Sequence, residues 1–291
     1  MASLKEYIKE KRPNLGESSV TTYNSILKNL YQKVFDSGEI DVRKFNDAEA
    51  ILKYLKEHVP SSSKRKTILS ALVVITDDQE YRDLMLSDIK TYNSDISKQQ
   101  KTVAQKKSWV SSEDINSLWK NLKHNADLLY KKAELSVTDL QQIQGFIIIS
   151  LLGGIFIPPR RSLDYVKLMI KDADKEKGNY IDKKELVFNC YKTSKFYGTQ
   201  RVVMPPVLKS ILNKWCKFNP TSYLLFDTHM GPLSSVTLNQ RINKLFKKKV
   251  SVNQLRHSYL TDNYAASNKA LINDLANMGT SMAQATTYIK N

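Results

Sequence analysis

In the first third of the chain, hydrophobic residues recur every three or four positions, which is the spacing of one face of an α-helix. The first such stretch lies behind two serines and has its apolar face on Val20, Tyr23, Leu27 and Leu30. No strand pattern of comparable strength occurs before residue 95, so we predict a small helical domain. Helices are predicted over residues 18–35, over 46–59 with Asn46 as the cap, and over 61–76.

The period of the pattern changes in the remainder of the chain. A serine-capped helix is predicted from residue 111, followed by a buried helix in the apolar run 143–157. That run has about 15 residues and is followed by two prolines and two arginines, so it is shorter than the ~20 residues of a membrane span. Alternating residues predict strands at 186–190 and 200–204, joined by a polar loop. Further helices are predicted at 207–218, at 234–249, from about 251, and from about 269 to 278.

A basic segment separates these two parts. Residues 96–108 contain four lysines, no acid and little apolar periodicity. Such a segment is either a solvated connector or a basic strap across a phosphate backbone, and both interpretations stay open. We therefore predict a helical domain over 1–95, a linker over 96–108 and a second domain over 109–291.

Composition and charge change this picture in one respect. The hydrophobic fraction of 41% is that of an ordinary globular protein, but 45 Lys and Arg against 29 Asp and Glu give a net charge of +16. This excess favours a polyanionic partner, with DNA or RNA first, an anionic membrane surface second, and a basic but merely soluble protein as the alternative. Two cysteines and an N-terminal stretch without an apolar core predict a soluble, intracellular protein that is not secreted.

Several common chemistries have no motif in this sequence. It contains no P-loop, no G-x-G-x-x-G and no G-x-S-x-G, and its four histidines are scattered. We therefore expect no metal ion and no cofactor. What the sequence does contain is a set of arginines and lysines beside breaks in the apolar pattern.

One such place is P-P-R-R-S-L-D, where Arg160 and Arg161 are predicted to end the buried apolar helix. Two guanidinium groups beside a core require an anion or a carboxylate. Asp164 satisfies this requirement as the partner of Arg161, or the pair of arginines grips a phosphate; from these residues alone both remain open. Further candidates are Arg256 with His257 in Q-L-R-H-S-Y, and Tyr288 in a polar stretch near the end.

The order and spacing of these pieces resemble the catalytic domain of tyrosine recombinases, the phage-integrase family. In that family the first arginine, matched here by Arg161 or by its neighbour Arg160, has a carboxylate three residues later, where Asp164 lies. A lysine on a β-hairpin is matched by Lys192 in Y-K-T-S-K, with Lys195 as the second choice. The wording P-P-R-R-x-x-D-Y looks most like integrases of large DNA viruses, virophages and related mobile elements.

The later motifs of the family also have counterparts here. The H-x-L-R-H box reads Asn253-Gln254-Leu255-Arg256-His257, and an L-G-H-like segment is matched by Asn277-Met278-Gly279-Thr280. Tyr288 follows Thr280 by eight residues. Asn253 and Thr280 thus replace positions that are usually histidine, and neither side chain shuttles a proton. The resemblance covers about residues 109–291 and implies a mainly helical fold with a small sheet or hairpin, in which a helical core-binding domain and an α+β catalytic domain clamp DNA.

The resemblance also implies a mechanism. Tyr288 attacks a DNA phosphodiester and forms a 3′-phosphotyrosyl link without metal or ATP. Arg161 and Arg256 hold the phosphate, Lys192 is the general acid, and Asn253 and Thr280 complete the hydrogen bonds. The implied supporting residues are Asp164, which orients Arg161, together with Arg160, Lys195 and His257.

The implied partner is double-stranded DNA, bound by a homo-tetramer on two sites that is a monomer or weak oligomer when free. The expected location is DNA-associated, in a host nucleus, a viral replication compartment or a prokaryotic cytoplasm, and not at a membrane. A type IB topoisomerase-like enzyme, or a DNA-binding protein of this fold with weakened or lost catalysis, are the alternatives to a recombinase. The expected phosphate contacts are Lys64, Arg65, Lys66, Lys98, Lys101, Lys106, Lys107, Arg241, Lys244, Lys247, Lys248 and Lys249.

Overall fold

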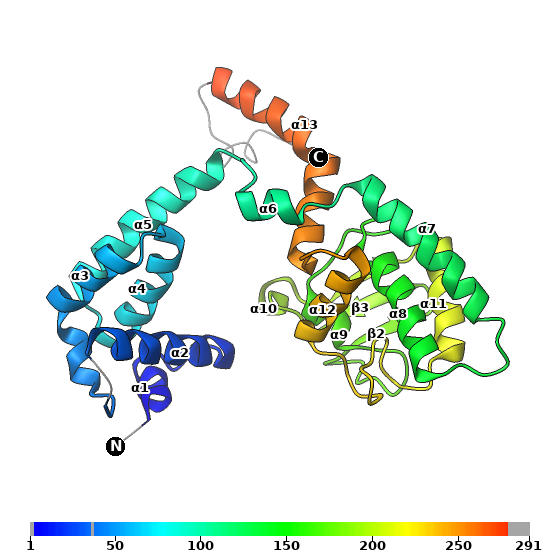
Figure 1. Cartoon of the computed structure of the whole chain (residues 1–291), viewed down its shortest axis with the longest axis horizontal. Coiled ribbons are helices and arrows are strands. Elements are labelled where there is room, and N and C mark those ends of the chain that lie inside the picture. Colours follow the sequence, from blue (N-terminus) through cyan, green and yellow to red (C-terminus); the bar gives the residue numbers. More distant parts are fainter. Residues whose placement is uncertain (1–2, 36–37, 279–291) are drawn as a thin grey trace. The chain divides into compact units, whose positions relative to one another are not determined.

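The structure of the protein is a computed structural model, and it describes residues 3–35 and 38–278. The chain divides into two compact units, residues 1–100 and 101–291, each with its own hydrophobic core (Figure 1). The division falls inside the basic segment 96–108. Within the described ranges, no helix has both the length and the apolar character needed to cross a membrane.

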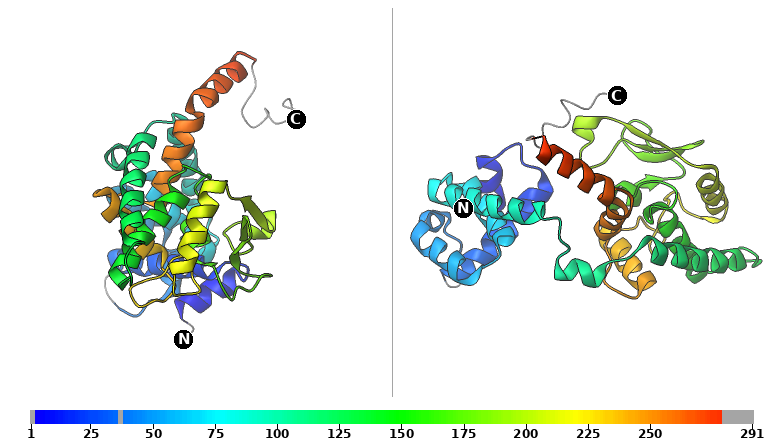
Figure 2. Two further views of the ribbon diagram at one scale, coloured as in Figure 1. Left: turned by 90° about the vertical axis from the view of Figure 1, so that its right-hand side faces the viewer. Right: turned by 90° about the horizontal axis from the view of Figure 1, so that it is seen from above.

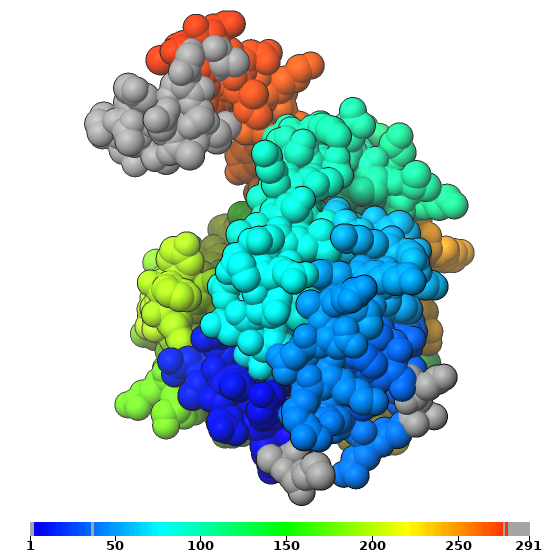
Figure 3. All heavy atoms as spheres, turned by 90° about the vertical axis from the view of Figure 1, so that its left-hand side faces the viewer, coloured from blue at the N-terminus to red at the C-terminus, as the bar shows by residue number. Residues whose placement is uncertain are grey.

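Unit 1 consists of helices and their connections, with no strand in its described residues, as the sequence predicts. Its core includes Ile8, Leu27 and Leu72, each fully buried. Figure 3 shows the surface of this unit, in blue to cyan. The helices are α1 (Leu4–Lys11), α2 (Glu17–Val34), the 3₁₀ helix η1 (Val42–Asn46), α3 (Ala48–His58), α4 (Ser62–Thr76) and α5 (Gln79–Ser97).

Capping side chains set where these helices begin. Ser61 accepts a hydrogen bond from the backbone N–H of Lys64 and starts α4. The cap of α3 is Asp47, which accepts from the N–H of Ala50 at 3.1 Å, and not Asn46, which ends η1. The predicted cap was therefore wrong by one residue.

Unit 2 is built around a buried helix. Helix α8 is buried on nearly all sides and packs against α7, α11, α12 and α13 (Figure 1). Residues 143–152 of this helix are all buried and have no polar face, which is typical of a helix surrounded by others. The helices of unit 2 are α6 (Val103–Ser108), α7 (Ser112–Leu129), α8 (Val137–Leu152), α9 (Ser162–Val166), α10 (Ser194–Tyr197), α11 (Pro206–Phe218), α12 (Ser235–Phe246) and α13 (Val252–Asn277).

A small sheet completes unit 2. Its strands lie in the order β1-β2-β3-β4, with β1 parallel to β2 and the other neighbours antiparallel. In the β3–β4 hairpin Phe188 pairs with Gln200. The two ends of the loop that joins these strands therefore lie side by side. The fold class, mainly helical with a small sheet, is as predicted. The strands are β1 (Leu168–Met169), β2 (Asn179–Asp182), β3 (Glu185–Phe188) and β4 (Gln200–Val203).

Several boundaries differ from the prediction, and three of these differences concern the site or the linker. Helix α8 ends at Leu152, so Arg160 and Arg161 do not end it but precede the short helix α9. The two helices predicted after residue 251 form one continuous helix, α13, which extends from the body of unit 2 (Figure 2). The basic linker is partly helical, because its first residues continue α5 and residues 103–108 form α6.

Gly154 lies in the turn that follows α8. This residue has a φ of +74°, and a Cβ there would lie 2.4 Å from Cδ2 of Tyr259 in α13. We expect Gly154→Ala to lower the free energy of unfolding by about 1–3 kcal/mol, because alanine disfavours this φ and would displace the tyrosine ring. Urea unfolding followed by circular dichroism measures the change. Gly38→Ala is the matched control, since nothing lies within 4 Å of the added Cβ; equal stability of both variants would contradict the prediction.

Candidate active site

Two arginines that lie far apart in the sequence come near each other in unit 2. Arg161 is the exposed N-cap residue of α9, and Arg256 lies half-buried near the start of α13. Burial lowers the pKa of the Arg256 guanidinium, and the positive charge of Arg161 lowers it further, whereas Asp164 opposes the shift. The two guanidinium groups are therefore close enough to repel each other.

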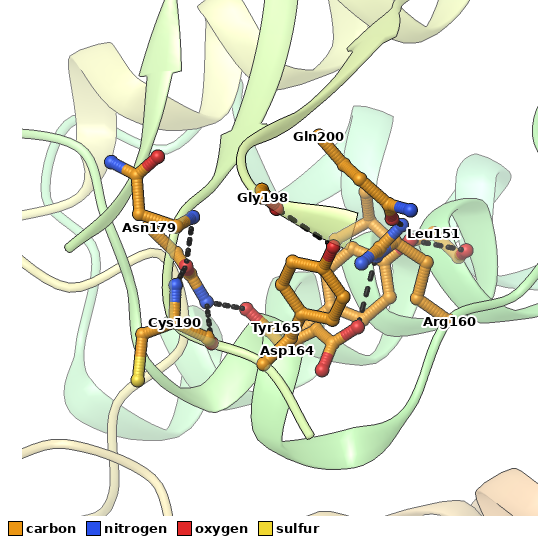
Figure 4. Close-up of polar contacts among 10 residues, drawn as sticks. Leu151, Arg160, Asp164, Tyr165, Asn179, Cys190, Gly198 and Gln200 are labelled. Atoms are coloured by element: carbon orange, nitrogen blue, oxygen red, sulfur yellow. Dashed lines mark hydrogen bonds and ion pairs between the residues drawn. The ribbon is translucent and has the colours of Figure 1, made fainter. Parts of the chain in front are cut away.

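The carboxylate beside them belongs to a different arginine than predicted (Figure 4). Nε of Arg160 donates to Oδ2 of Asp164 at 2.9 Å, and Nη1 of Arg160 donates to Oε1 of Gln200 at 2.6 Å. The guanidinium carbon lies 4.1 Å from the centroid of the Phe188 ring. Asp164 thus holds Arg160, and the predicted orientation of Arg161 by Asp164 is corrected: Arg160 is a half-buried structural residue, and Arg161 forms no ion pair with a described carboxylate.

Only one of the two carboxylate oxygens of Asp164 has a hydrogen-bond partner among the described residues. Its side chain is buried, and Oδ1 has no hydrogen-bond partner among the described residues. Burial raises the pKa of Asp164 above its ordinary value although Arg160 and Arg161 act in the opposite direction. Three guanidinium groups and one carboxylate leave this region with an excess of positive charge, which suits a phosphate group.

The predicted lysines lie on the loop between β3 and β4. Lys192 and Lys195 are both exposed, and neither forms an ion pair with a described residue. The base of the loop is anchored, because the hydroxyl of Tyr191 donates to the carbonyl of Gly198 at 2.8 Å. The guanidinium of Arg160 lies 5.1 Å from the Tyr191 ring. Arg160 therefore connects the helix after Arg161 to the loop that carries the lysines.

Buried Asn179 makes a second connection, which the sequence did not indicate. Its Nδ2 donates to the carbonyls of Asp164 at 3.0 Å and of Cys190 at 2.9 Å (Figure 4). Its Oδ1 accepts from the N–H groups of Asn189 and Cys190. A lone asparagine at the start of a strand gives no signal of such a role. Gln200 was missed for the same reason.

The remaining motif residues divide into described and undescribed ones. Asn253 and His257 are exposed on α13 near Arg256, with Nδ2 of Asn253 lying 3.4 Å from Nε2 of His257. Thr280 and Tyr288 lie outside the described residues. No group of three or more His, Cys, Asp or Glu side chains in the described ranges is arranged to hold a metal ion.

Several residues that were predicted to contact phosphates form interactions within their own unit instead. Arg65 forms a largely buried ion pair with Asp88 and also donates to the carbonyl of Val59 at 3.0 Å. Arg241 donates to Gln144 at 3.2 Å and to the carbonyl of Phe226 at 3.0 Å. These interactions give both arginines a structural role.

The lysines of the set fall into two groups. Lys248 donates to the carbonyl of Trp109 at 2.6 Å, Lys101 and Lys66 lie over aromatic rings, and Lys98 pairs with Asp95. The others are exposed and make no ion pair with a described residue. These are Lys64, Lys106, Lys107, Lys244, Lys247 and Lys249.

Comparisons with known proteins gave a match only among solved structures. No family model matches the sequence, and no curated protein does. A XerA recombinase matches with a TM-score of 0.37 and 16% identity over 89% of this chain and 82% of that one. A lambda integrase(75–356) dimer bound to a COC′ core site matches with a TM-score of 0.45 and 12% identity over 90% of both chains. A lambda integrase tetramer bound to a Holliday junction matches with a TM-score of 0.43 and 14% identity over 91% and 74%.

Proposed function

We propose that this protein cuts and rejoins DNA through a covalent phosphotyrosyl intermediate, as a recombinase or integrase of the tyrosine-recombinase type. The observation that carries the proposal is the exposed Arg161, which lies near Arg256 and beside a carboxylate that Arg160 already holds; both arginines match family positions. Two guanidinium groups that repel each other gain from an anion placed between them. A phosphodiester has that charge and two free oxygens to accept their hydrogen bonds.

The proposed reaction assigns each motif residue the role that the resemblance implies. The Tyr288 hydroxyl releases its proton to water, and its oxygen bonds to the phosphorus. The phosphate stays attached to the 3′ end of the cut strand, and the bond from phosphorus to the 5′ oxygen breaks. Lys192 donates a proton to the leaving 5′ oxygen, while Arg161 and Arg256 stabilise the charge on the phosphate oxygens. Attack by a 5′-hydroxyl reverses the step and releases Tyr288, so the energy of the phosphodiester is retained and no ATP is consumed.

Asn253 and Thr280 would complete the hydrogen bonds to the phosphate. Asn253 lies exposed next to Arg256 on α13, as this role requires. An amide donates a hydrogen bond but does not transfer a proton, so we expect slower turnover than with histidine. His257 and Lys195 would act as supporting residues.

We further propose that DNA is bound as a duplex by both units and that two duplexes are joined by four copies of the chain. The exposed lysines of units 1 and 2 that form no ion pair with a described residue would contact phosphates. Such contacts give affinity that falls steeply with salt and little sequence preference. The motif wording in P-P-R-R-x-x-D-Y leads us to expect a mobile element or virus as the source.

Covalent trapping tests the proposal. The full chain and a Tyr288→Phe variant are incubated with nicked suicide duplexes, without metal or ATP, and separated on a denaturing gel. We expect a slowly migrating protein–DNA band with the unaltered protein and none with Tyr288→Phe, because phenylalanine lacks the nucleophilic oxygen.

The other outcomes identify the alternatives. If both proteins shift the DNA in a native gel but neither forms the band, the protein binds DNA without cutting it. If the unaltered protein forms the band and relaxes supercoiled plasmids of any sequence without joining two duplexes, it is a topoisomerase-like enzyme.

A further inference from the structure

Two aromatic side chains are exposed at the end of the loop that carries Lys192. Phe196 and Tyr197, which together we call the loop tip, are 86% and 70% exposed. They lie in the short helix α10, which projects from the sheet of unit 2 (Figure 1). Neither ring stacks on another aromatic ring of the described residues. Single exposed apolar residues are common, but two adjacent aromatic side chains that are both largely exposed indicate a binding surface.

Hydrogen bonds at the base of the loop hold the loop tip in place. The hydroxyl of Tyr191 donates to the carbonyl of Gly198, and Oγ1 of Thr199 donates to Oδ1 of Asn189, both at 2.8 Å. Gly198 has a φ of +61° and a ψ of −156°, a conformation that is essentially restricted to glycine. The rings are therefore presented on a constrained loop and are not part of a loose connection.

The charge around the loop tip limits what binds it. No Asp or Glu occurs between Leu186 and Phe226, and the tip is flanked by the exposed Lys192 and Lys195. A partner with negative charge and flat apolar faces fits both features. Nucleic acid has both, since the bases supply the faces and the backbone supplies the charge.

We propose that the loop tip stacks on DNA bases next to the phosphate that is cut, and this inference rests on the function proposed above. Phe196 follows Lys192 by four residues, so their Cα atoms are at most about 14 Å apart. With about 3.4 Å between successive nucleotides of a strand, the rings reach bases within roughly four positions of the phosphate that Lys192 serves. Aromatic rings stack on any base, so the contact favours unpaired or unstacked bases without reading their sequence.

The test uses two duplexes of one sequence, one fully paired and one with a short mispaired run containing 2-aminopurine. The full chain is expected to bind the mispaired duplex more tightly and to quench the 2-aminopurine fluorescence by stacking. Base stacking on aromatic rings contributes roughly 5- to 140-fold in affinity per base. We expect Phe196→Ala/Tyr197→Ala to lose at least about fivefold of this preference and the quenching, and Phe196→Tyr to keep both.

Two control variants separate this effect from others. Leu128→Ala removes an exposed apolar side chain from α7 and is expected to change neither the preference for the mispaired duplex nor the fluorescence quenching. Lys195→Ala is expected to weaken binding of both duplexes equally, because a phosphate contact does not depend on base pairing.

Each remaining outcome overturns the proposal in a recognisable way. Unchanged preference and quenching in the double variant would exclude stacking, while adduct formation through Tyr288 would still support the proposed function. A double variant that loses self-association without DNA but keeps the preference would make the loop tip a contact between copies of the chain. Failure of the unaltered protein to bind any DNA would overturn the proposed function and the stacking together.

Discussion

An Arg161→Ala variant is expected to form the covalent protein–DNA adduct about 10²–10³ times more slowly than the unaltered protein. The guanidinium of Arg161 is exposed, near Arg256, and pairs with no described carboxylate, so its charge is available to the phosphate. Removing it takes away hydrogen bonds that strengthen as charge builds up in the transition state. The free energy of unfolding is expected to change by less than about 0.5 kcal/mol, as for a surface substitution. Single-turnover cleavage of a suicide duplex and urea unfolding measure the two effects.

Two further substitutions make this result specific. Arg161→Lys keeps the charge but loses the fork of donors, and we expect an intermediate rate. Lys120→Ala, in α7, removes an exposed cation that makes no ion pair with a described residue and is expected to leave the rate within about twofold. Equal rates for Arg161→Ala and the unaltered protein would show that Arg161 does not hold the phosphate.

The sequence alone did not distinguish Arg160 from Arg161. Adjacent arginines before a short helix have the same composition signal, and Asp164 lies within reach of either along the chain. What decides between them is Gln200 on β4 and the ring of Phe188 on β3, which are brought to Arg160 by the fold. Contacts between residues so distant in sequence leave no periodic pattern to read.

Helices and strands were predictable to different degrees for the same reason. Helices α4 and α7 have local signals, a serine cap followed by an apolar face, and both begin where the sequence predicts. Strands β1 and β2 are short and depend on pairing with distant residues, and neither was predicted. The proximity of Arg161 and Arg256 was expected only from the resemblance in motif order. Residues so far apart in the sequence give no local pattern that predicts a contact.

Arg160 gives the opposite prediction to Arg161, because its role is structural. Arg160→Met is expected to lower the free energy of unfolding by about 3–5 kcal/mol, since it leaves the buried carboxylate of Asp164 without its ion pair. Methionine retains much of the packing against Phe188, so the loss reports mainly on the charge. Urea unfolding at neutral pH measures it. Arg160→Met/Asp164→Asn is expected to be more stable than the single variant, because no unpaired charge is buried.

The pH dependence of this loss tests its cause. Burial already raises the pKa of Asp164, and without Arg160 the pKa rises further. An acid whose pKa is raised by folding destabilises the folded state only when it is ionised, so the cost is absent below its unfolded pKa of about 3.9 and grows as the pH rises above it. The difference in stability between Arg160→Met and the unaltered protein should therefore shrink from about pH 7 to about pH 4. A difference that stays constant over this range would mean that Arg160 acts through packing and that Asp164 is not the residue it neutralises.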